Sequence, residues 1–217
     1  MSTAGTAPVL KLAHSPDSDD LVMWWPLTGM RGPDGVPVDG ELGTPRIDLE
    51  GLTFELAAED VEALNAEVQG GGDALDITAI SAATYPSIAK TYAITTCGGS
   101  FGEGYGPKVV VSNDAPITTA ADLLDKTIGV PGTRTSAFTT LSLLLRNVAG
   151  DATNSPSEND GTADGRPVFD PAPMLFSEIP AAVVSGRVEA GLLIHEAQLT
   201  FESMGLRKVL DVGAWWT

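Results

Sequence analysis

Short apolar runs alternate with segments of helical pattern along almost the whole chain, and this order most limits the possible folds. The apolar runs, which we expect to be strands, are 9–13, 52–57, 75–80, 92–96, 108–112, 127–130, 190–194 and 208–212. Between two of them, Val61, Leu64 and Val68 recur at the spacing of one helix face. Strands that alternate with helices are typical of parallel sheets with helices on both faces. We therefore expect an α/β fold.

The segments between the apolar runs predict helices at 21–27, 59–69, 81–89, 119–126, 136–148, 177–185 and 196–204. Two stretches without periodicity, 30–46 and 150–166, interrupt this pattern and are interpreted as surface insertions. A glycine-rich break precedes the run at 108–112. We expect two α/β lobes, 1–108 and 109–217, that are joined by extended strands and enclose a ligand cleft.

The charge of the chain excludes several classes of function. The 217 residues include 12 Lys and Arg against 29 Asp and Glu, a net charge of −17. Without a basic stripe, binding to nucleic acid or to an anionic membrane surface is not expected. The sequence shows no secretory signal and no apolar stretch of the ~18 residues that span a membrane, so we expect a cytoplasmic protein. The single Cys97 excludes an internal disulfide.

Three loops between a strand and the next helix carry polar groups. In parallel sheets such loops open onto one crevice at the carboxyl ends of the strands. The first, 14–20, offers the imidazole of His14, carboxylates up to Asp20 and a helix N-terminus. The alternative interpretation is a plain helix cap in which Asp19 or Asp20 is the capping residue.

The second and third loops are 78–83 and 130–137. In the second, Ser81 stands beside small residues that allow close approach of a ligand, although an ordinary helix start has the same composition. The third contains hydroxyls up to Ser136 before free helical N–H groups, an arrangement that suits a carboxylate or phosphate. Arg134 in this loop is a candidate partner for an anion or a solvated side chain. The loop lacks the lysine of a P-loop.

His195 is one of two histidines and follows the apolar run 190–194. A buried strand delivers the residue after it to the rim of the sheet, where α/β proteins keep their ligand crevices. Imidazole titrates near neutral pH, so this position suits a general base. A histidine that is merely hydrogen-bonded at a strand end is the alternative.

Five segments, in order, resemble the 1,4-dihydroxy-6-naphthoate synthase family of the futalosine route to menaquinone. They are His14-Ser-Pro-Asp-Ser-Asp-Asp20, Glu59-Asp-Val-Glu-Ala-Leu-Asn65, Gly102-Glu-Gly-Tyr-Gly-Pro107, Val130-Pro-Gly-Thr-Arg-Thr-Ser-Ala137 and the run from Val188 to Trp216. The resemblance implies a two-lobed periplasmic-binding-protein-like (type II) fold with an interlobe cleft. It also implies a cytoplasmic lyase that converts cyclic dehypoxanthine futalosine to 1,4-dihydroxy-6-naphthoate without a metal or redox cofactor.

By this resemblance, His195 is the general base. The residues expected to bind the small-molecule substrate are Ala79, Ile80, Ser81, Ser136 and Ala137, with His14 and Asp20 as further candidates. Some family members carry lysine where this chain has Ala79, so a cationic contact with a substrate carboxylate is expected to be missing. Residues 17–19 also depart from the family's Cys-Pro-Asn.

Family members continue beyond the segment that ends at Trp216, so the resemblance implies an incomplete first lobe with exposed apolar surface. A homodimer is one way to cover that surface. Three alternatives stay open: a non-catalytic small-molecule binding protein of the same fold, an inactive fragment, and the related enzyme that makes an enolpyruvyl-benzoate from chorismate. The loops of His14 and His195 fit that last enzyme less well.

Overall fold

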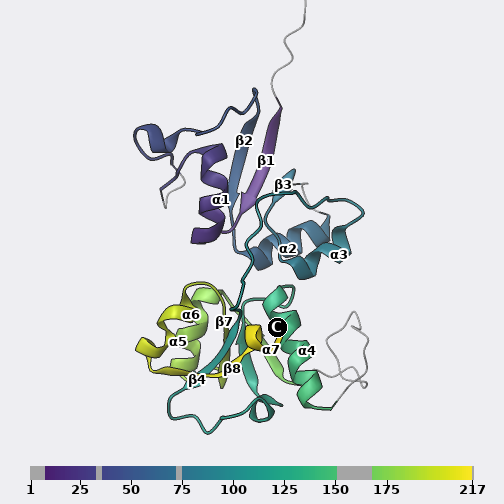
Figure 1. Cartoon of the computed structure of the whole chain (residues 1–217), viewed down its shortest axis with the longest axis vertical. Coiled ribbons are helices and arrows are strands. Elements are labelled where there is room, and N and C mark those ends of the chain that lie inside the picture. Colours follow the sequence, from purple (N-terminus) through teal and green to yellow (C-terminus); the bar gives the residue numbers. More distant parts are fainter. Residues whose placement is uncertain (1–7, 33–35, 72–74, 151–167, 217) are drawn as a thin grey trace, which may run out of the picture. The chain divides into compact units, whose positions relative to one another are not determined.

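The chain forms two compact α/β units, Met1–Ser100 and Phe101–Thr217. The computed structural model describes residues 8–32, 36–71, 75–150 and 168–216. Each unit has its own sheet and its own helices, as Figure 1 shows. The expected α/β class is therefore confirmed, and the domain limits 1–108 and 109–217 stay a prediction.

The first unit is built on a parallel sheet with the strand order β2-β1-β3. Its strands are β1 (Val9–His14), β2 (Thr53–Ala58) and β3 (Ile77–Thr78). β1 pairs with β2 along its full length, and Leu12 and Ala13 pair with the two residues of β3. Because the three strands run in one direction, the loops after β1 and β3 leave the sheet at the same edge.

Helices lie along this sheet as the apolar pattern predicts (Figure 1). They are α1 (Ser18–Thr28), α2 (Val61–Gly70) and α3 (Tyr85–Ile88), with 3₁₀ turns η1 (Glu41–Gly43) and η2 (Ala82–Thr84). Asp60 caps α2 by accepting the N–H of Glu62, and Gly71 ends it in the left-handed conformation. Ala13, Leu64, Val68, Leu75 and Ile88 form the apolar core of the unit.

Two sequence-based strand assignments in the first unit need correction. The strand expected at 75–80 is only the two residues of β3, and 92–96 forms no strand. The N–H of Tyr92 donates to the carbonyl of Ile88, so this run continues from the end of α3 instead of pairing as a strand.

The N-cap residue of α1 is Asp17, and not Asp19 or Asp20 as the sequence suggested. The 30–46 segment contains η1 and an Arg31–Pro37 bridge.

The second unit contains a mixed sheet with the strand order β6-β5-β7-β4-β8. The strands are β4 (Lys108–Ser112), β5 (Thr127–Val130), β6 (Asp170–Pro173), β7 (Ala190–Leu193) and β8 (Leu206–Asp211). β4 runs antiparallel to both β7 and β8, so the expectation of a wholly parallel sheet is wrong for this unit. β6 was not expected, because Pro171 and Pro173 disfavour a strand except at a sheet edge, where β6 lies.

Helices cover both faces of this sheet (Figure 1). They are α4 (Ser136–Val148), α5 (Ile179–Val184), α6 (Ala197–Thr200) and α7 (Val212–Trp216), with 3₁₀ turns η3 (Ala121–Leu123), η4 (Phe176–Glu178) and η5 (Phe201–Met204). α4 packs on one apolar cluster, which includes Phe138 and Leu141, and α5 packs on a second, which includes Ile179. The helix expected at 119–126 is only the turn η3. The expected insertion 150–166 lies, except for Gly150, outside the described residues.

None of the helices in the described part of the chain combines the length and the apolar character that crossing a membrane requires. The longest is α4, with 13 residues. Its limits coincide with those predicted from the sequence.

Asp122 accepts four hydrogen bonds and is expected to make the second unit sensitive to acid. Its carboxylate accepts hydrogen bonds from the N–H groups and the hydroxyls of Thr118 and Thr119, and these lower its pKa from 3.8 to about 2. A carboxyl whose pKa is lower in the folded state stabilises the fold above its unfolded pKa, and this contribution is lost as the pH falls through the folded pKa.

We therefore expect the melting temperature of the protein to fall between about pH 4 and about pH 2, and Asp122→Asn to lessen this fall. Thermal melts followed by circular dichroism across this pH range measure the effect. Asp114→Asn, which changes an exposed carboxylate of the same segment, is the control. Equal acid sensitivity of Asp122→Asn and the unmodified protein would contradict the assignment.

Candidate functional site

His195 lies two residues after the end of β7 and has a positive φ. Its φ of 54° lies in the left-handed region, which is uncommon for residues other than glycine and which Glu50 and Asp125 also adopt. The carbonyl of His195 accepts the N–H of Gln198 at 3.1 Å, which helps to hold this turn before α6. The side chain is half-buried, and its ring lies against Phe176, with 4.9 Å between ring centroids. The imidazole is thus positioned at the sheet edge and not buried in the core.

The N-terminus of α4 lies after β5, which is the strand next to β7. Thr135 caps this helix by accepting the N–H of Phe138 at 3.2 Å, and its own hydroxyl donates to the carbonyl of Gly132 at 2.9 Å. This hydroxyl is therefore engaged in the cap and not directed at a ligand. The N–H of Ala137 belongs to the first turn, for which the helix has no acceptor. The second unit thus brings Ser136, Ala137 and His195 to the carboxyl ends of neighbouring parallel strands.

In the first unit, His14 is the last residue of β1 and Asp20 lies in the first turn of α1, and both are buried beside the polar loop between these elements. The Nδ1 atom of His14 lies 2.7 Å from the carbonyl oxygen of Ser15, so this nitrogen carries the proton. The N–H of Ser15 donates to Asp20 at 2.8 Å, and its hydroxyl donates to Asp17 at 2.8 Å. Burial raises the pKa of Asp20, and the hydrogen bonds from Ser15 oppose that shift. Most polar groups of this loop therefore have partners within the loop itself.

Ser81 lies in the loop after β3, at the same sheet edge as His14. It is half-buried, and its N–H donates to the side-chain oxygen of Asn65 at 2.9 Å. The amide nitrogen of Asn65 donates to the Ser81 hydroxyl at 3.1 Å. The side chains of Ala79 and Ile80 pack against the apolar core of the unit. At the sheet edge these two residues therefore offer chiefly their backbone groups.

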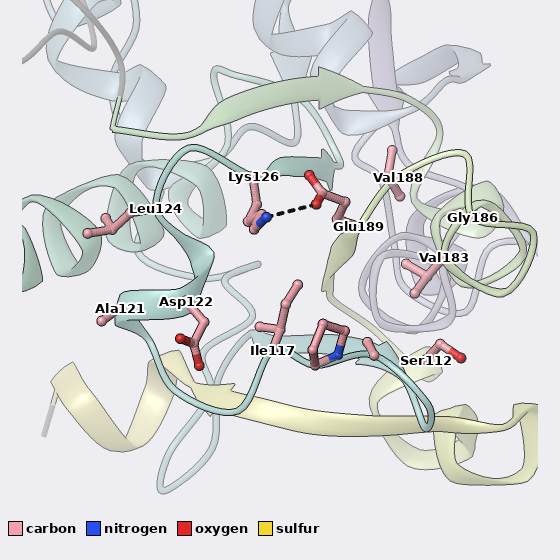
Figure 2. Close-up of a pocket in the computed structure, with 12 residues that line it drawn as sticks. Ser112, Ile117, Ala121, Asp122, Leu124, Lys126, Val183, Gly186, Val188 and Glu189 are labelled. Atoms are coloured by element: carbon pink, nitrogen blue, oxygen red, sulfur yellow. Dashed lines mark ion pairs between the residues drawn. The ribbon is translucent and has the colours of Figure 1, made fainter.

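A cavity in the second unit lies away from His195, and Figure 2 shows the residues that line it. It has a volume of about 490 Å³, and its lining includes Ile117, Val188 and the ion pair Lys126–Glu189 at 3.1 Å. Lys126 and Glu189 directly precede β5 and β7, so this cavity is at the amino ends of the strands, opposite to His195. The N–H of Thr127 also donates to Glu189. This hydrogen bond and the contact with Lys126 together lower the pKa of Glu189. The polar groups here are paired with one another, and we do not assign the cavity to the functional site.

Two residues that contact candidate site residues were not predicted from the sequence. Asn65 is completely buried on α2, on the same inner face as Leu64 and Val68. A polar side chain on the inner face of a helix was the available signal for it. Phe176 contacts His195, but it comes from η4, 19 residues earlier in the chain, and no local pattern pairs the two.

Comparison with known sequences agrees with this arrangement of motifs. The sequence profile of a family described as "Menaquinone biosynthesis" matches residues 10–217. A curated relative from Streptomyces coelicolor, named "1,4-dihydroxy-6-naphtoate synthase", is 33% identical over 97% of this chain and 61% of its own length. A relative of the same name from Thermus thermophilus is 30% identical over 95% of this chain and 60% of its own length. The chain thus spans about 60% of the length of these relatives.

Solved structures show which fold the chain has. A protein from Archaeoglobus fulgidus superposes with a TM-score of 0.68 at 33% identity, covering 96% of this chain and 62% of its own. The alkanesulfonate-binding protein of Xanthomonas axonopodis pv. citri superposes with a TM-score of 0.57 at 15% identity, over 95% of this chain and 62% of its own. The fold is periplasmic-binding-protein-like, as the resemblance implied. Since the profile covers nearly the whole sequence, the chain belongs to the menaquinone-biosynthesis family.

Proposed function

We propose that this protein is a carbon–carbon lyase that converts cyclic dehypoxanthine futalosine to 1,4-dihydroxy-6-naphthoate. Both curated relatives carry the name of this enzyme. The single structural observation that carries the proposal is His195, a half-buried imidazole held at a strand end by a strained backbone. Strained non-glycine residues cluster at active sites, where the surrounding structure holds them in place.

In this proposal, neutral His195 acts as the general base and removes a proton from the substrate. The electron pair left behind drives cleavage of a carbon–carbon bond, and the sugar-derived fragment leaves. Aromatisation of the naphthalene ring makes the step favourable. A positioned base of this kind contributes about 10²–10⁴-fold to a rate. Glu196 is exposed beside His195, where it is one candidate for orienting the imidazole.

The proposed substrate contacts come from strand ends. The N-terminal turn of α4, with Ser136 and Ala137, suits a carboxylate or hydroxyl group because its first N–H groups point out of the helix. We also propose substrate contacts for residues 79–81, His14 and Asp20. The proposal includes a cytoplasmic location, and a homodimer stays a prediction.

A binding protein is the alternative, since the Xanthomonas protein of this fold is named an alkanesulfonate-binding protein. The decisive experiment incubates the protein with cyclic dehypoxanthine futalosine and separates the products by liquid chromatography with mass detection. The proposal expects 1,4-dihydroxy-6-naphthoate to accumulate in proportion to protein and time. Tight binding in equilibrium dialysis, with the compound unchanged over hours, would favour a binding protein instead.

A further inference from the structure

Asn65 and Ser81 form a paired contact between α2 and the loop after β3. Asn65 is completely buried, whereas Ser81 is half-buried at the sheet edge. Both ends of the Asn65 amide bind the same residue: its oxygen accepts the Ser81 N–H at 2.9 Å, and its nitrogen donates to the Ser81 hydroxyl at 3.1 Å. A buried amide that uses both ends on one serine constrains the orientation of that serine.

The chemistry of the two contacts fixes which way the amide points. A backbone N–H can only donate, so the atom of Asn65 that faces it must be the oxygen. The NH₂ group is then left for the Ser81 hydroxyl, and NH₂ can only donate. The Ser81 oxygen therefore accepts from Asn65, and the hydrogen of its O–H group points away from the amide. Ser81 is thus oriented as a hydrogen-bond donor toward another group.

We propose that Asn65 is a positioning residue that makes Ser81 a donor to a carboxylate oxygen of the substrate. This inference rests on the proposed function, whose product carries a carboxylate. Hydrogen bonds to a charged acceptor are stronger than those between neutral groups, so a serine held as a donor favours a carboxylate. Ala79, two residues before Ser81, has no charge to offer the same group. Ser81 provides a neutral contact at this strand end.

The inference is tested by variants that change the direction in which the Ser81 hydroxyl donates its hydrogen bond, or that remove this hydroxyl. In Asn65→Asp with the carboxylate ionised, one oxygen still accepts the Ser81 N–H and the other can only accept, so the Ser81 hydroxyl turns to donate inward. Ser81→Ala removes the hydroxyl and keeps the N–H contact. Gln69→Glu is the matched control, because Gln69 also donates its amide to a serine hydroxyl, that of Ser87, on the exposed end of the same helix.

Isothermal titration with 1,4-dihydroxy-6-naphthoate and with 1,4-dihydroxynaphthalene, which lacks the carboxylate, gives the readout. We expect Asn65→Asp and Ser81→Ala each to weaken binding of the naphthoate by about 10- to 100-fold. Affinity for dihydroxynaphthalene should change by less than about threefold in the same variants. The double variant should bind the naphthoate about as weakly as Ser81→Ala alone, because Asn65 acts through that hydroxyl. Gln69→Glu should bind like the unmodified protein.

If either variant loses affinity equally for the naphthoate and for dihydroxynaphthalene, the role of the residue is structural and the inference is overturned. A buried carboxylate can unfold α2, so Ser81→Ala keeps the test decisive by itself. If the unmodified protein binds the naphthoate and Ser81→Ala binds it equally well, the inference fails and the proposed function stands. If the unmodified protein neither binds the naphthoate nor converts cyclic dehypoxanthine futalosine, both fail.

Discussion

Replacing His195 with asparagine is expected to reduce turnover of cyclic dehypoxanthine futalosine by about 10²–10⁴-fold, the usual contribution of a general base. Asparagine is the appropriate replacement because it tolerates a positive φ better than other non-glycine residues, and the φ at this position is 54°. The turn between β7 and α6 is therefore expected to keep its shape. Substrate affinity should change much less than the rate, since the proposed role is in the proton transfer.

Initial rates of naphthoate formation, together with a thermal melt of each variant, measure this effect. Glu202→Gln is the control, because Glu202 is an exposed residue of η5, the turn that follows α6. A loss of less than about tenfold in His195→Asn would argue against a base at this position.

Replacing Leu141 with alanine is expected to lower the free energy of unfolding of the second unit by about 2–5 kcal/mol. Leu141 is completely buried on α4, and truncation there removes apolar contacts and leaves a cavity in the cluster that joins α4 to the sheet. Leu143, two residues further along the same helix, is 37% exposed. Leu143→Ala removes the same atoms and is expected to cost less than about 1 kcal/mol.

Urea unfolding of the two variants, followed by circular dichroism, provides the comparison. Because the substitutions are chemically identical and share one helix, their helix propensities change equally, and the difference reports burial alone. Equal losses in stability would contradict the packing of α4 described above.

The sequence predicted best the elements whose local signals agree with the tertiary structure. α4 has the limits that the sequence predicted, and in the structure its buried apolar face agrees with the cap that Thr135 provides. β1 and β7 were also expected, since each is a short apolar run between polar segments. These elements place His14 and His195 at strand ends, where the sequence analysis expected them.

The errors arise where distant partners decide the outcome. The run at 92–96 has the composition of a strand, but the chain there hydrogen-bonds back to α3. β6 contains two prolines, and it forms because β5 offers a free edge with which it pairs in parallel. The antiparallel direction of β4 depends on how β7 and β8 flank it, which local patterns do not encode.

The same distinction applies to the candidate site. The strand-end histidine could be selected from its own segment, whereas the contact of Asn65 with Ser81 joins residues 16 positions apart. The sequence also suggested that several hydroxyls of the 130–137 loop would face a ligand. Thr135 instead uses its hydroxyl to cap α4, a role that follows from the helix start one residue later.

The most direct test of the central claim is chemical rescue of His195→Gly by imidazole in solution. Glycine accepts the φ of 54° without strain and leaves an imidazole-sized space beside Phe176. If His195 supplies the base, the variant should form naphthoate slowly, and added imidazole should raise its rate by about tenfold or more in proportion to concentration. A His195→Gly variant that turns over at the unmodified rate, with or without imidazole, would contradict the claim.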